Sequence, residues 1–169
     1  TYCFFYNSKN EPRLTLGPDW PFTLIKLLLV NGILGYLFHC MNKIEHSWVF
    51  VGGLILLLTE NALFLATVLV NPGMPPRDLD AHSEAYLNKV KILRPNLFCK
   101  TCKVVYREGV KTEHCEYCDC CIEETDHHCP WSSKCIARRN QGFFQTFLFF
   151  LTLLIIFLFT AGIVTASLD

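Results

Sequence analysis

The sequence predicts an α-helical integral membrane protein with three transmembrane helices and a small cysteine-rich domain. Two observations lead to this fold class. Three long apolar runs, at 20–40, 48–70 and 143–166, are each close to the ~20 residues that a helix needs to cross the bilayer core. Between the second and third runs, residues 99–135 hold eight of the ten cysteines and three of the six histidines. The chain is therefore expected to divide into a membrane part and a metal-binding part.

Composition and charge argue against two common classes of small protein. The chain has fifteen basic and fifteen acidic residues, so no net charge favours nucleic acid. Ten cysteines could form the disulfide framework of a secreted domain. However, residues 1–19 do not have the basic start and apolar core of a secretory signal peptide, and the cysteines alternate with histidines at metal-ligand spacing. We therefore expect a reduced, zinc-loaded domain in the cytoplasm.

The first segment, 1–19, is mixed in character. Its aromatic residues Tyr2, Phe4, Phe5 and Tyr6 are followed by polar residues, prolines and a glycine. Amphipathic rings favour the membrane–water interface, whereas a terminus of this composition could equally be loosely packed. Both interpretations stay open, and in either case we expect the segment to be cytoplasmic or interfacial.

Residues 20–70 are expected to form a transmembrane hairpin of two helices, 20–40 and 48–70. The first helix carries a single charge, Lys26, close enough to its start for the ammonium to reach the lipid headgroups. The second carries Glu60 near its middle, where a carboxylate is costly unless it is neutral, paired or turned toward protein. Between a transport role and a buried polar clamp, we favour the clamp, because nothing nearby suggests ion transport.

Asn71-Pro72-Gly73 ends the second helix, because proline cannot continue it and glycine permits a reversal. Residues 71–142 are expected to form the cytosolic domain, with a short amphipathic helix over 81–93 near the membrane surface or packed on the metal module. The third helix, 143–166, has no charge and seven phenylalanines. Basic residues flank the runs on the side of the cysteine-rich segment, which places that segment and the N-terminus in the cytoplasm. These residues are Arg77, Lys134, Arg138 and Arg139.

The cysteine-rich segment has the ligand spacing of structural zinc sites. A Cys-x2-Cys pair such as Cys99 with Cys102 can present two thiolates to one tetrahedral zinc. A second pair follows at Cys115 and Cys118. Two closed sites need eight ligands and the segment offers eleven cysteines and histidines, so three must be left over. The other candidates are His114, Cys120, Cys121, His127, His128, Cys129 and Cys135.

The alternation of side chains suggests which groups are left over. In an extended stretch successive side chains point to opposite faces, so His127 and Cys129 share a face and His128 points the other way. If His128 binds metal, a histidine and a thiol remain together, with Asp126 adjacent to orient the imidazole. These are the parts of an activated cysteine nucleophile. Spacing alone leaves open the alternative that Cys129 is one more zinc ligand.

Three motifs resemble those of a known family, the DHHC family of protein S-acyltransferases. The central motif is Asp126-His127-His128-Cys129-Pro130-Trp131, with His114-Cys115-x2-Cys118-x2-Cys121 before it and Cys135 after it. Asn71-Pro72-Gly73 resembles the Asp-Pro-Gly motif of that family, and Asn140 with Phe144 resembles its Asn-x3-Phe motif. The resemblance covers about 20–166 in architecture and is motif-specific at 71–73 and 99–144.

The resemblance implies two interleaved zinc sites and an acyl-transfer reaction. Cys129 would be the nucleophile, His127 its base and Asp126 the residue that holds the histidine, with Cys120 left without a role. The implied reaction passes a long-chain acyl group, such as palmitoyl, from acyl-CoA to Cys129 and then to membrane-proximal cysteines of substrate proteins. One zinc site would use Cys99, Cys102, His114 and Cys121, and the other would use Cys115, Cys118, His128 and Cys135.

Departures from the family motivate a different function. Residues 132–137 replace its usual Val-x-Asn-Cys-Ile-Gly segment, and its fourth helix and Thr-Thr-x-Glu motif do not occur in this sequence. We expect the fourth helix in a longer protein of which this chain is the ordered part. The alternative function is a zinc-stabilised membrane subunit or adaptor of a larger assembly, with weak or no acyl transfer. A metal or redox sensor built on Cys120 and Cys129 is a third interpretation, and none of the three involves nucleic acid.

Overall fold

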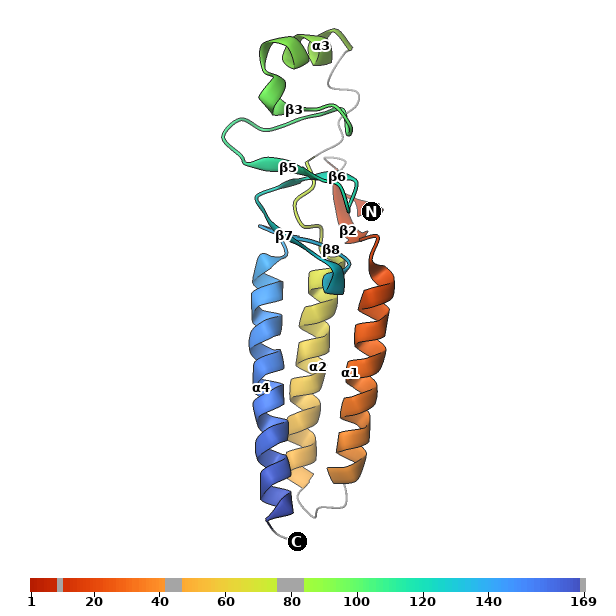
Figure 1. Ribbon diagram of the computed structural model, residues 1–169, viewed down its shortest axis with the longest axis vertical. Helices are drawn as coiled ribbons and strands as arrows, with labels where there is room; N and C mark the ends of the chain where they lie inside the picture. The colour runs from red at the N-terminus through yellow and green to blue at the C-terminus, as the bar shows by residue number, and fades with distance from the viewer. Residues whose placement is uncertain (9–10, 42–46, 76–83, 168–169) are drawn as a thin grey trace.

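The computed structural model describes residues 1–8, 11–41, 47–75 and 84–167. Three long helices lie side by side, and a module of short strands covers the end of the bundle where α1 begins and α2 ends (Figure 1). A short helix, α3 (Glu84–Leu93), lies beyond the module at the end of the molecule farthest from the bundle. The long helices are α1 (Trp20–Met41), α2 (Ser47–Leu69) and α4 (Gln141–Ala166).

Two helices in the described part of the chain are long and apolar enough to cross a membrane. They are α2 over Val49–Leu69 and α4 over Gln141–Val164. In α1 the apolar stretch is shorter, Trp20–Tyr36, so its crossing stays a prediction. Large aliphatic and aromatic side chains are exposed along all three helices, which is unfavourable in water and suits lipid. The chain is therefore a membrane-associated helical protein that carries a cysteine-rich domain.

The bundle is held together by small apolar clusters rather than one large core. At the end nearer the module, Phe64 and Val68 of α2 are buried against Phe147 of α4, and the two phenylalanine rings lie 5.1 Å apart. Deeper in the bundle, one leucine from each helix is buried in a second cluster. These leucines are Leu34, Leu57 and Leu154.

The two charges of the first and second helices face one another inside the bundle. Lys26 Nζ lies 2.6 Å from Glu60 Oε1, and the side chains are 11% and 0% exposed. The ammonium also lies 3.7 Å from the centre of the Phe64 ring, a cation–π contact. The prediction that Lys26 reaches the headgroups is therefore wrong, because its partner lies on the neighbouring helix, whereas the polar clamp at Glu60 is confirmed. Beside it, Asn31 and Asn61 exchange two amide hydrogen bonds of 3.0 Å.

The segment before α1 is an antiparallel hairpin of β1 (Tyr2–Tyr6) and β2 (Pro12–Leu16). The interpretation of a loosely packed terminus is therefore wrong. Thr15 in β2 is fully buried, and Thr1 Oγ1 donates a 2.9 Å hydrogen bond to the carbonyl of Cys118. After β2, a Cβ at Gly17 would overlap the carbonyl oxygen of Ser133, so only glycine allows this approach of hairpin and module.

Short antiparallel hairpins build the cysteine-rich module. Positive-φ residues follow the second cysteine of each Cys-x2-Cys pair, Lys103 at 54° and Asp119 at 49°, and reverse the chain there. The strand pairs are β3 (Phe98–Cys99) with β4 (Val104–Val105), β5 (Thr112–Cys115) with β6 (Cys120–Glu123), and β7 (Thr125–Cys129) with β8 (Lys134–Ala137). Two 3-10 turns, η1 (Pro95–Leu97) and η2 (Pro130–Ser132), complete it. The module's apolar core is Met74, Cys118, Cys120, Ile122, Cys135 and Ala137.

Two asparagines connect the helices to the module. Asn71, just past α2, donates to the Pro12 carbonyl at 2.7 Å, and its Oδ1 accepts the amides of the second and third residues after it. Asn140, just before α4, donates to the carbonyls of Thr67 and Cys135 at 3.3 and 3.1 Å. Asn140 thus joins α2 and β8 at the start of α4, and Asn71 joins the segment that follows α2 to β2.

A buried lysine makes the third connection. Lys134 Nζ donates to both oxygens of Thr15 and to the Val70 carbonyl, the latter at 2.7 Å. Burial lowers the pKa of Lys134 to about 7, whereas the three acceptor oxygens favour the ammonium. The side chain thus spans β8, β2 and the end of α2.

Part of the predicted organisation lies outside the described residues. The turn after the first helix (42–46), Arg77 and the start of the predicted 81–93 helix belong to this part. The described helix α3 begins at Glu84 and lies on the module's far side, not against the membrane end of the bundle (Figure 1). Of the two placements considered for this helix, the structure therefore has the one on the module.

Candidate metal and thiol site

The first cluster is built from two hairpins. Cys99 and Cys102 lie at the β3–β4 knuckle, and His114 and Cys121 are cross-strand partners on β5 and β6. Their ligand atoms lie within 4.8 Å of one another. His114 Nδ1 is 3.3 Å from Cys102 Sγ and 4.0 Å from Cys121 Sγ. The Tyr106 hydroxyl lies 3.7 Å from the Cys121 sulfur, at the edge of the cluster.

The second cluster lies between the β5–β6 turn and the β7–β8 hairpin. It contains Cys115, Cys118, His128 and Cys135, again within 4.8 Å of one another. His128 Nδ1 lies 3.6, 3.3 and 3.6 Å from the sulfurs of Cys115, Cys118 and Cys135. The Cys118 and Cys135 sulfurs are 3.8 Å apart. His114 and Cys115 are consecutive residues on β5, so this strand gives one ligand to each cluster.

These separations fit a closed tetrahedral metal site. Zinc bonds of about 2.3 Å to sulfur and about 2.0–2.1 Å to nitrogen would set sulfur–sulfur edges of about 3.8 Å and sulfur–nitrogen edges of about 3.5 Å. The second cluster matches these edges, and the first is close to them. Both clusters could therefore hold a metal ion. They are the same two sets of four residues that the sequence resemblance implied.

Neighbouring thiols in the clusters shift one another's pKa in opposite directions. Burial raises the pKa of the Cys121 thiol, and the contact with Cys118, together with burial, raises the pKa of Cys135. The contacts with Cys120 and Cys135 lower the pKa of Cys118. A divalent metal would bind all the cysteines of a cluster as thiolates, and its binding would release the remaining protons.

The two histidines of the central motif are held in opposite tautomers. His128 Nε2 lies 2.8 Å from Asp19 Oδ2, and since a carboxylate only accepts, Nε2 carries the proton and Nδ1 is free for metal. His127 Nδ1 lies 3.3 Å from Asp126 Oδ2, which places the proton on Nδ1 and leaves Nε2 as the basic atom. The Tyr117 ring stacks on His128 at 4.9 Å. His128 thus has Nδ1 available toward the sulfurs, and His127 has Nε2 available to accept a proton.

Cys129 belongs to neither cluster. It is the last residue of β7, its side chain is buried at 8% exposure, and alternation along the strand places it on the same face as His127. Among the described residues, no hydrogen bond joins its thiol to the His127 ring. The turn η2 follows at once, and its Trp131 carbonyl accepts a 3.0 Å hydrogen bond from Thr23 of α1. The thiol therefore lies where the module meets the start of the first helix.

Sequence reasoning missed three residues that the site uses. Asp19 precedes the first apolar run, a position that reads as a helix start and gives no indication of His128. Tyr117 lies between two ligands of the second cluster, and its place in the sequence does not indicate that its ring stacks on His128. The resemblance implies no role for Cys120, yet its side chain is 4% exposed and packs in the module core. Asp19 reaches the site only through the fold, whereas for Tyr117 and Cys120 the fold adds the contacts.

Comparisons with known proteins agree with the geometry. Residues 93–168 match the family model described as DHHC palmitoyltransferase. The chain is 30% identical to "Palmitoyltransferase ZDHHC18-A" of Danio rerio over 80% of its own length and 33% of that protein. It is 30% identical to "Probable protein S-acyltransferase 1" of Arabidopsis thaliana, over 87% of its own length and 52% of the relative.

A third relative is more similar over a shorter stretch. "Probable protein S-acyltransferase 3" of Arabidopsis thaliana is 44% identical over 84 residues, which are 50% of this chain and 18% of that protein. The chain spans between a third and about half the length of the first curated relatives it matches. The matched domain contains the central motif and both ligand clusters, and these similarities make the chain a member of the DHHC palmitoyltransferase family.

Proposed function

We propose that this chain is the membrane-embedded catalytic part of a protein S-acyltransferase that moves a long-chain acyl group, such as palmitoyl, from acyl-CoA to cysteines of substrate proteins. One observation supports this most strongly. In a single strand, His128 turns to a metal-type cluster, while Cys129 stays outside both clusters, on the same face of the strand as an imidazole that contacts Asp126. A thiol kept out of a metal site and placed near a base has the arrangement of a nucleophile.

In the first step the Cys129 thiol loses its proton to His127 Nε2 and its sulfur attacks the thioester carbonyl of acyl-CoA. The carbon–sulfur bond to CoA breaks, the CoA thiolate takes the proton from His127, and an acyl-Cys129 thioester remains. Asp126 holds the proton of His127 on Nδ1, so that Nε2 can accept and return a proton.

In the second step a substrate cysteine attacks the acyl-Cys129 carbonyl. Its thiol proton goes to His127 Nε2, the bond from the acyl carbon to Cys129 sulfur breaks, and the Cys129 thiolate takes the proton back. Both steps exchange one thioester for another, so neither needs an oxidant or an energy source. The start of α1, where Thr23 donates to the Trp131 carbonyl, would keep the acyl group close to the bilayer while the reaction proceeds.

Zinc is the metal that suits two closed sites of three thiolates and one imidazole each. At each cluster it would be held by the four residues described above, where it would supply charge and cross-links rather than reaction chemistry. The metals would fix β5 to β8 and with them the position of Cys129.

A cleft beside the module offers cations for the phosphates of CoA. It has a volume of about 300 Å³ and is lined by Gly73, Arg107, Glu123, Arg138 and Arg139. Guanidinium groups bind phosphates in a planar, two-pronged geometry. The arginines pair with glutamates at 3.4–3.5 Å, contacts that an incoming phosphate can replace.

We further place three helices, 20–40, 48–70 and 143–166, across the membrane, with the domain 71–142 and segment 1–19 on the cytoplasmic side. The apolar surfaces of the helices and the basic residues at the module support this topology. Its partners would be acyl-CoA, the bilayer and proteins with cysteines near the membrane, within a possible larger membrane assembly.

The decisive experiment is labelling of the purified full chain with radiolabelled palmitoyl-CoA. We expect one label per chain, released by hydroxylamine as a thioester is. Cys129→Ser should abolish the label and keep both metals. Cys120→Ser is the matched control, because Cys120 is also buried and outside the clusters, and it should keep the label.

Two outcomes would contradict the proposal. If Cys129→Ser releases a metal ion, Cys129 is a ligand and not a nucleophile. If the wild-type chain holds both metals and never forms the thioester, even when supplied in its full-length form, the chain acts as a scaffold or adaptor.

A further inference from the structure

Asp19 makes a contact with the second cluster that the proposed reaction does not account for. Its Oδ2 accepts a 2.8 Å hydrogen bond from Nε2–H of His128, and the two residues are 109 positions apart. The His128 side chain is 11% exposed and that of Asp19 29% exposed, so water competes little for this bond. The opposite ring nitrogen of His128 faces three sulfurs.

The position of Asp19 is itself fixed from several sides. Its amide donates to the Ser133 carbonyl at 3.4 Å, and its carbonyl accepts the amide of Phe22 in the first turn of α1. The nearby Gly17 amide donates to Ser133 Oγ at 3.0 Å. The carboxylate is therefore carried by the junction of hairpin, first helix and η2, and not by a free loop.

We infer that Asp19 is a positioning residue that sets the tautomer and orientation of His128 and thereby couples the first helix to the neighbouring nucleophile. Carboxylates that accept the distal N–H of a metal-bound histidine raise the ligand's basicity, and their loss typically costs 10–100-fold in metal affinity. Since His128 and Cys129 are consecutive, a shift of His128 moves the thiol. The catalytic consequence rests on the proposed function, whereas the effect on the metal does not.

The other cluster provides a matched comparison. His114 also presents Nδ1 to sulfurs, and its Nε2 faces a carboxylate, that of Asp119. However, the distance is 3.9 Å and the Asp119 side chain is 81% exposed, so there is no hydrogen bond. The protein thus contains two similar histidine ligands, of which one has the carboxylate partner and the other does not.

The test measures metal loss from the full-length protein to a strong chelator, in a Cys129→Ser background so that acylation has no influence. We expect two metals per chain and, in Asp19→Ala, loss of one of them about tenfold faster or more. Asp19→Asn, which keeps a weaker neutral acceptor in the same shape, should fall between Asp19→Ala and the starting protein. Asp119→Ala should leave both rates within about twofold.

A spectroscopic measurement separates orientation from general destabilisation. In the Co²⁺-substituted protein, Asp19→Asn should shift the ligand-field bands of one site, while Asp119→Ala should not. The proposal is overturned if Asp19→Ala releases metal at the starting rate, if Asp119→Ala has an equal effect, or if the Co²⁺ spectrum of Asp19→Asn is unchanged. It is also overturned if Asp19→Asn slows acylation in the Cys129-containing protein without changing metal retention.

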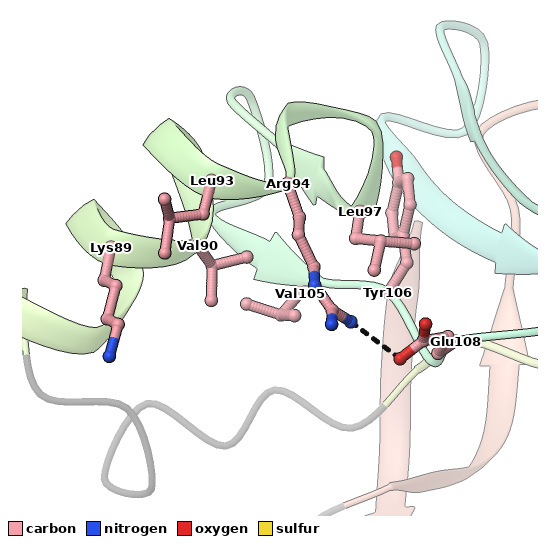
Figure 2. Close-up of a pocket in the computed structure, with 8 residues that line it drawn as sticks. All are labelled: Lys89, Val90, Leu93, Arg94, Leu97, Val105, Tyr106 and Glu108. Carbon is pink, nitrogen blue, oxygen red and sulfur yellow. Dashed lines mark hydrogen bonds and ion pairs between the residues drawn. The ribbon is translucent and has the colours of Figure 1, made fainter.

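A second, independent observation concerns the end of the module farthest from the bundle. Residues 84–111 contain seven of the fifteen basic residues of the chain and only two of the fifteen acidic ones. The same region holds a groove of about 460 Å³ between α3, η1 and β4 (Figure 2). Its apolar walls are Val90, Leu93, Leu97 and Val105, and its polar rim is Lys89, Arg94, Tyr106 and Glu108.

The geometry points to a docking groove for an acidic segment of a partner protein that inserts an aliphatic side chain. Leu93 is 66% exposed and Ile92 beside it is 76% exposed. Neighbouring apolar side chains that are this exposed to water are typical of a contact site for a partner. Arg94 is engaged by Glu108 at 2.7 Å, whereas Lys89, which has no ion-pair partner among the described residues, lies on the rim as a contact for an acidic residue (Figure 2). A lipid surface fits poorly, because α3 lies at the opposite end of the molecule from the membrane helices (Figure 1).

The probe is a short fluorescent peptide of alternating glutamate and leucine, titrated with the full chain in detergent and followed by anisotropy. Lys89→Glu and Leu93→Ser should each weaken binding about tenfold. Lys111→Glu, the same charge change at an exposed lysine outside the groove, should change binding less than about twofold. Equal binding of a lysine–leucine peptide, an equal effect of Lys111→Glu, or binding to phosphatidylserine vesicles but not to the peptide would each overturn the proposal.

Discussion

At the scale of single residues, the central motif assigns different tasks to two adjacent histidines through two carboxylates. His128 donates its Nε2 proton to Asp19 and presents Nδ1 to the sulfurs, whereas His127 donates its Nδ1 proton to Asp126. Because successive side chains of β7 point to opposite faces, the His127 imidazole and the Cys129 thiol lie on the same face of the strand. Sequence reasoning predicts these roles for Asp126, His127 and His128 because the residues are consecutive and successive side chains of a strand point to opposite faces.

The role of His127 gives the first prediction. His127→Ala should slow formation of the acyl-Cys129 thioester by about 10²–10⁴-fold, the usual contribution of a positioned general base, and Asp126→Asn should slow it less. Both variants should retain two metals per chain, because neither residue belongs to a cluster. The measurement is single-turnover labelling with palmitoyl-CoA, with metal content determined on the same samples. A normal rate in His127→Ala would show that the thiol is activated by another group.

At the scale of elements, contacts between distant parts of the chain determine which elements pair with one another, and no local sequence pattern predicts these contacts. Lys26 and Glu60 were each recognised as unusual in an apolar helix, but no pattern within one helix indicates that they meet at 2.6 Å. The sequence does not predict the N-terminal hairpin for the same reason, since β2 is held by a residue more than a hundred positions away, Lys134, which donates to Thr15. Periodicity and turn chemistry predict an element's existence, whereas its partners depend on the fold.

The clamp between α1 and α2 can be tested by a double-mutant cycle. Lys26→Met should destabilise the detergent-solubilised chain by about 3–5 kcal/mol, because it leaves the Glu60 carboxylate buried without its partner. Lys26→Met combined with Glu60→Met should recover most of that loss, since two apolar side chains can replace a buried pair. The reporter is thermal unfolding monitored by circular dichroism. A double variant as unstable as the sum of both single variants would mean that the two charges are not coupled.

The approach of hairpin and module at Gly17 makes a sharper prediction. Gly17→Ala should detach the hairpin, because the added methyl group would overlap the Ser133 carbonyl and Lys134 side chain. We expect faster hydrogen exchange over β1 and β2 and a lower melting temperature. Gly32→Ala in α1 is the matched control, because a Cβ there meets nothing within 4 Å. Unchanged exchange in Gly17→Ala would mean that the hairpin is held elsewhere.

At the scale of the whole molecule, the sequence predicts long apolar helices and a cysteine-rich segment, and the family resemblance implies the two sets of four residues that cluster in the structure. Neither predicts how the helices and the module are joined. Apolar run length predicts helices, and cysteine spacing restricts metal sites, because both depend on local geometry. The joints are single buried polar residues, Asn71, Asn140 and Lys134, each bonded to backbone atoms of other elements. The sequence singles out Asn71 and Asn140 only as members of two family motifs and Lys134 only as a flanking basic residue, and none of these patterns indicates the bonds that join the elements.

The helices and the module should respond differently when metal is removed. The module's apolar core consists of six small or medium residues, three of them cysteines, so it cannot supply the stability of a domain without metal. The α2–α4 contact is built from Phe64, Val68 and Phe147 and does not involve a ligand. A chelator should therefore unfold strands β3 to β8 and leave most of the helical circular dichroism signal in place.

Cysteine variants then separate metal loss from core damage. Cys121→Ala should reduce the metal content from two ions per chain to one, because Cys121 is a member of the first cluster. Cys120→Ala changes the adjacent buried thiol, which belongs to the core but to no cluster, and should keep both ions at a modest cost in melting temperature. Elemental analysis of the purified variants is the measurement. A loss of metal in Cys120→Ala, or full retention in Cys121→Ala, would show that the ligand sets are different from the two in the structure.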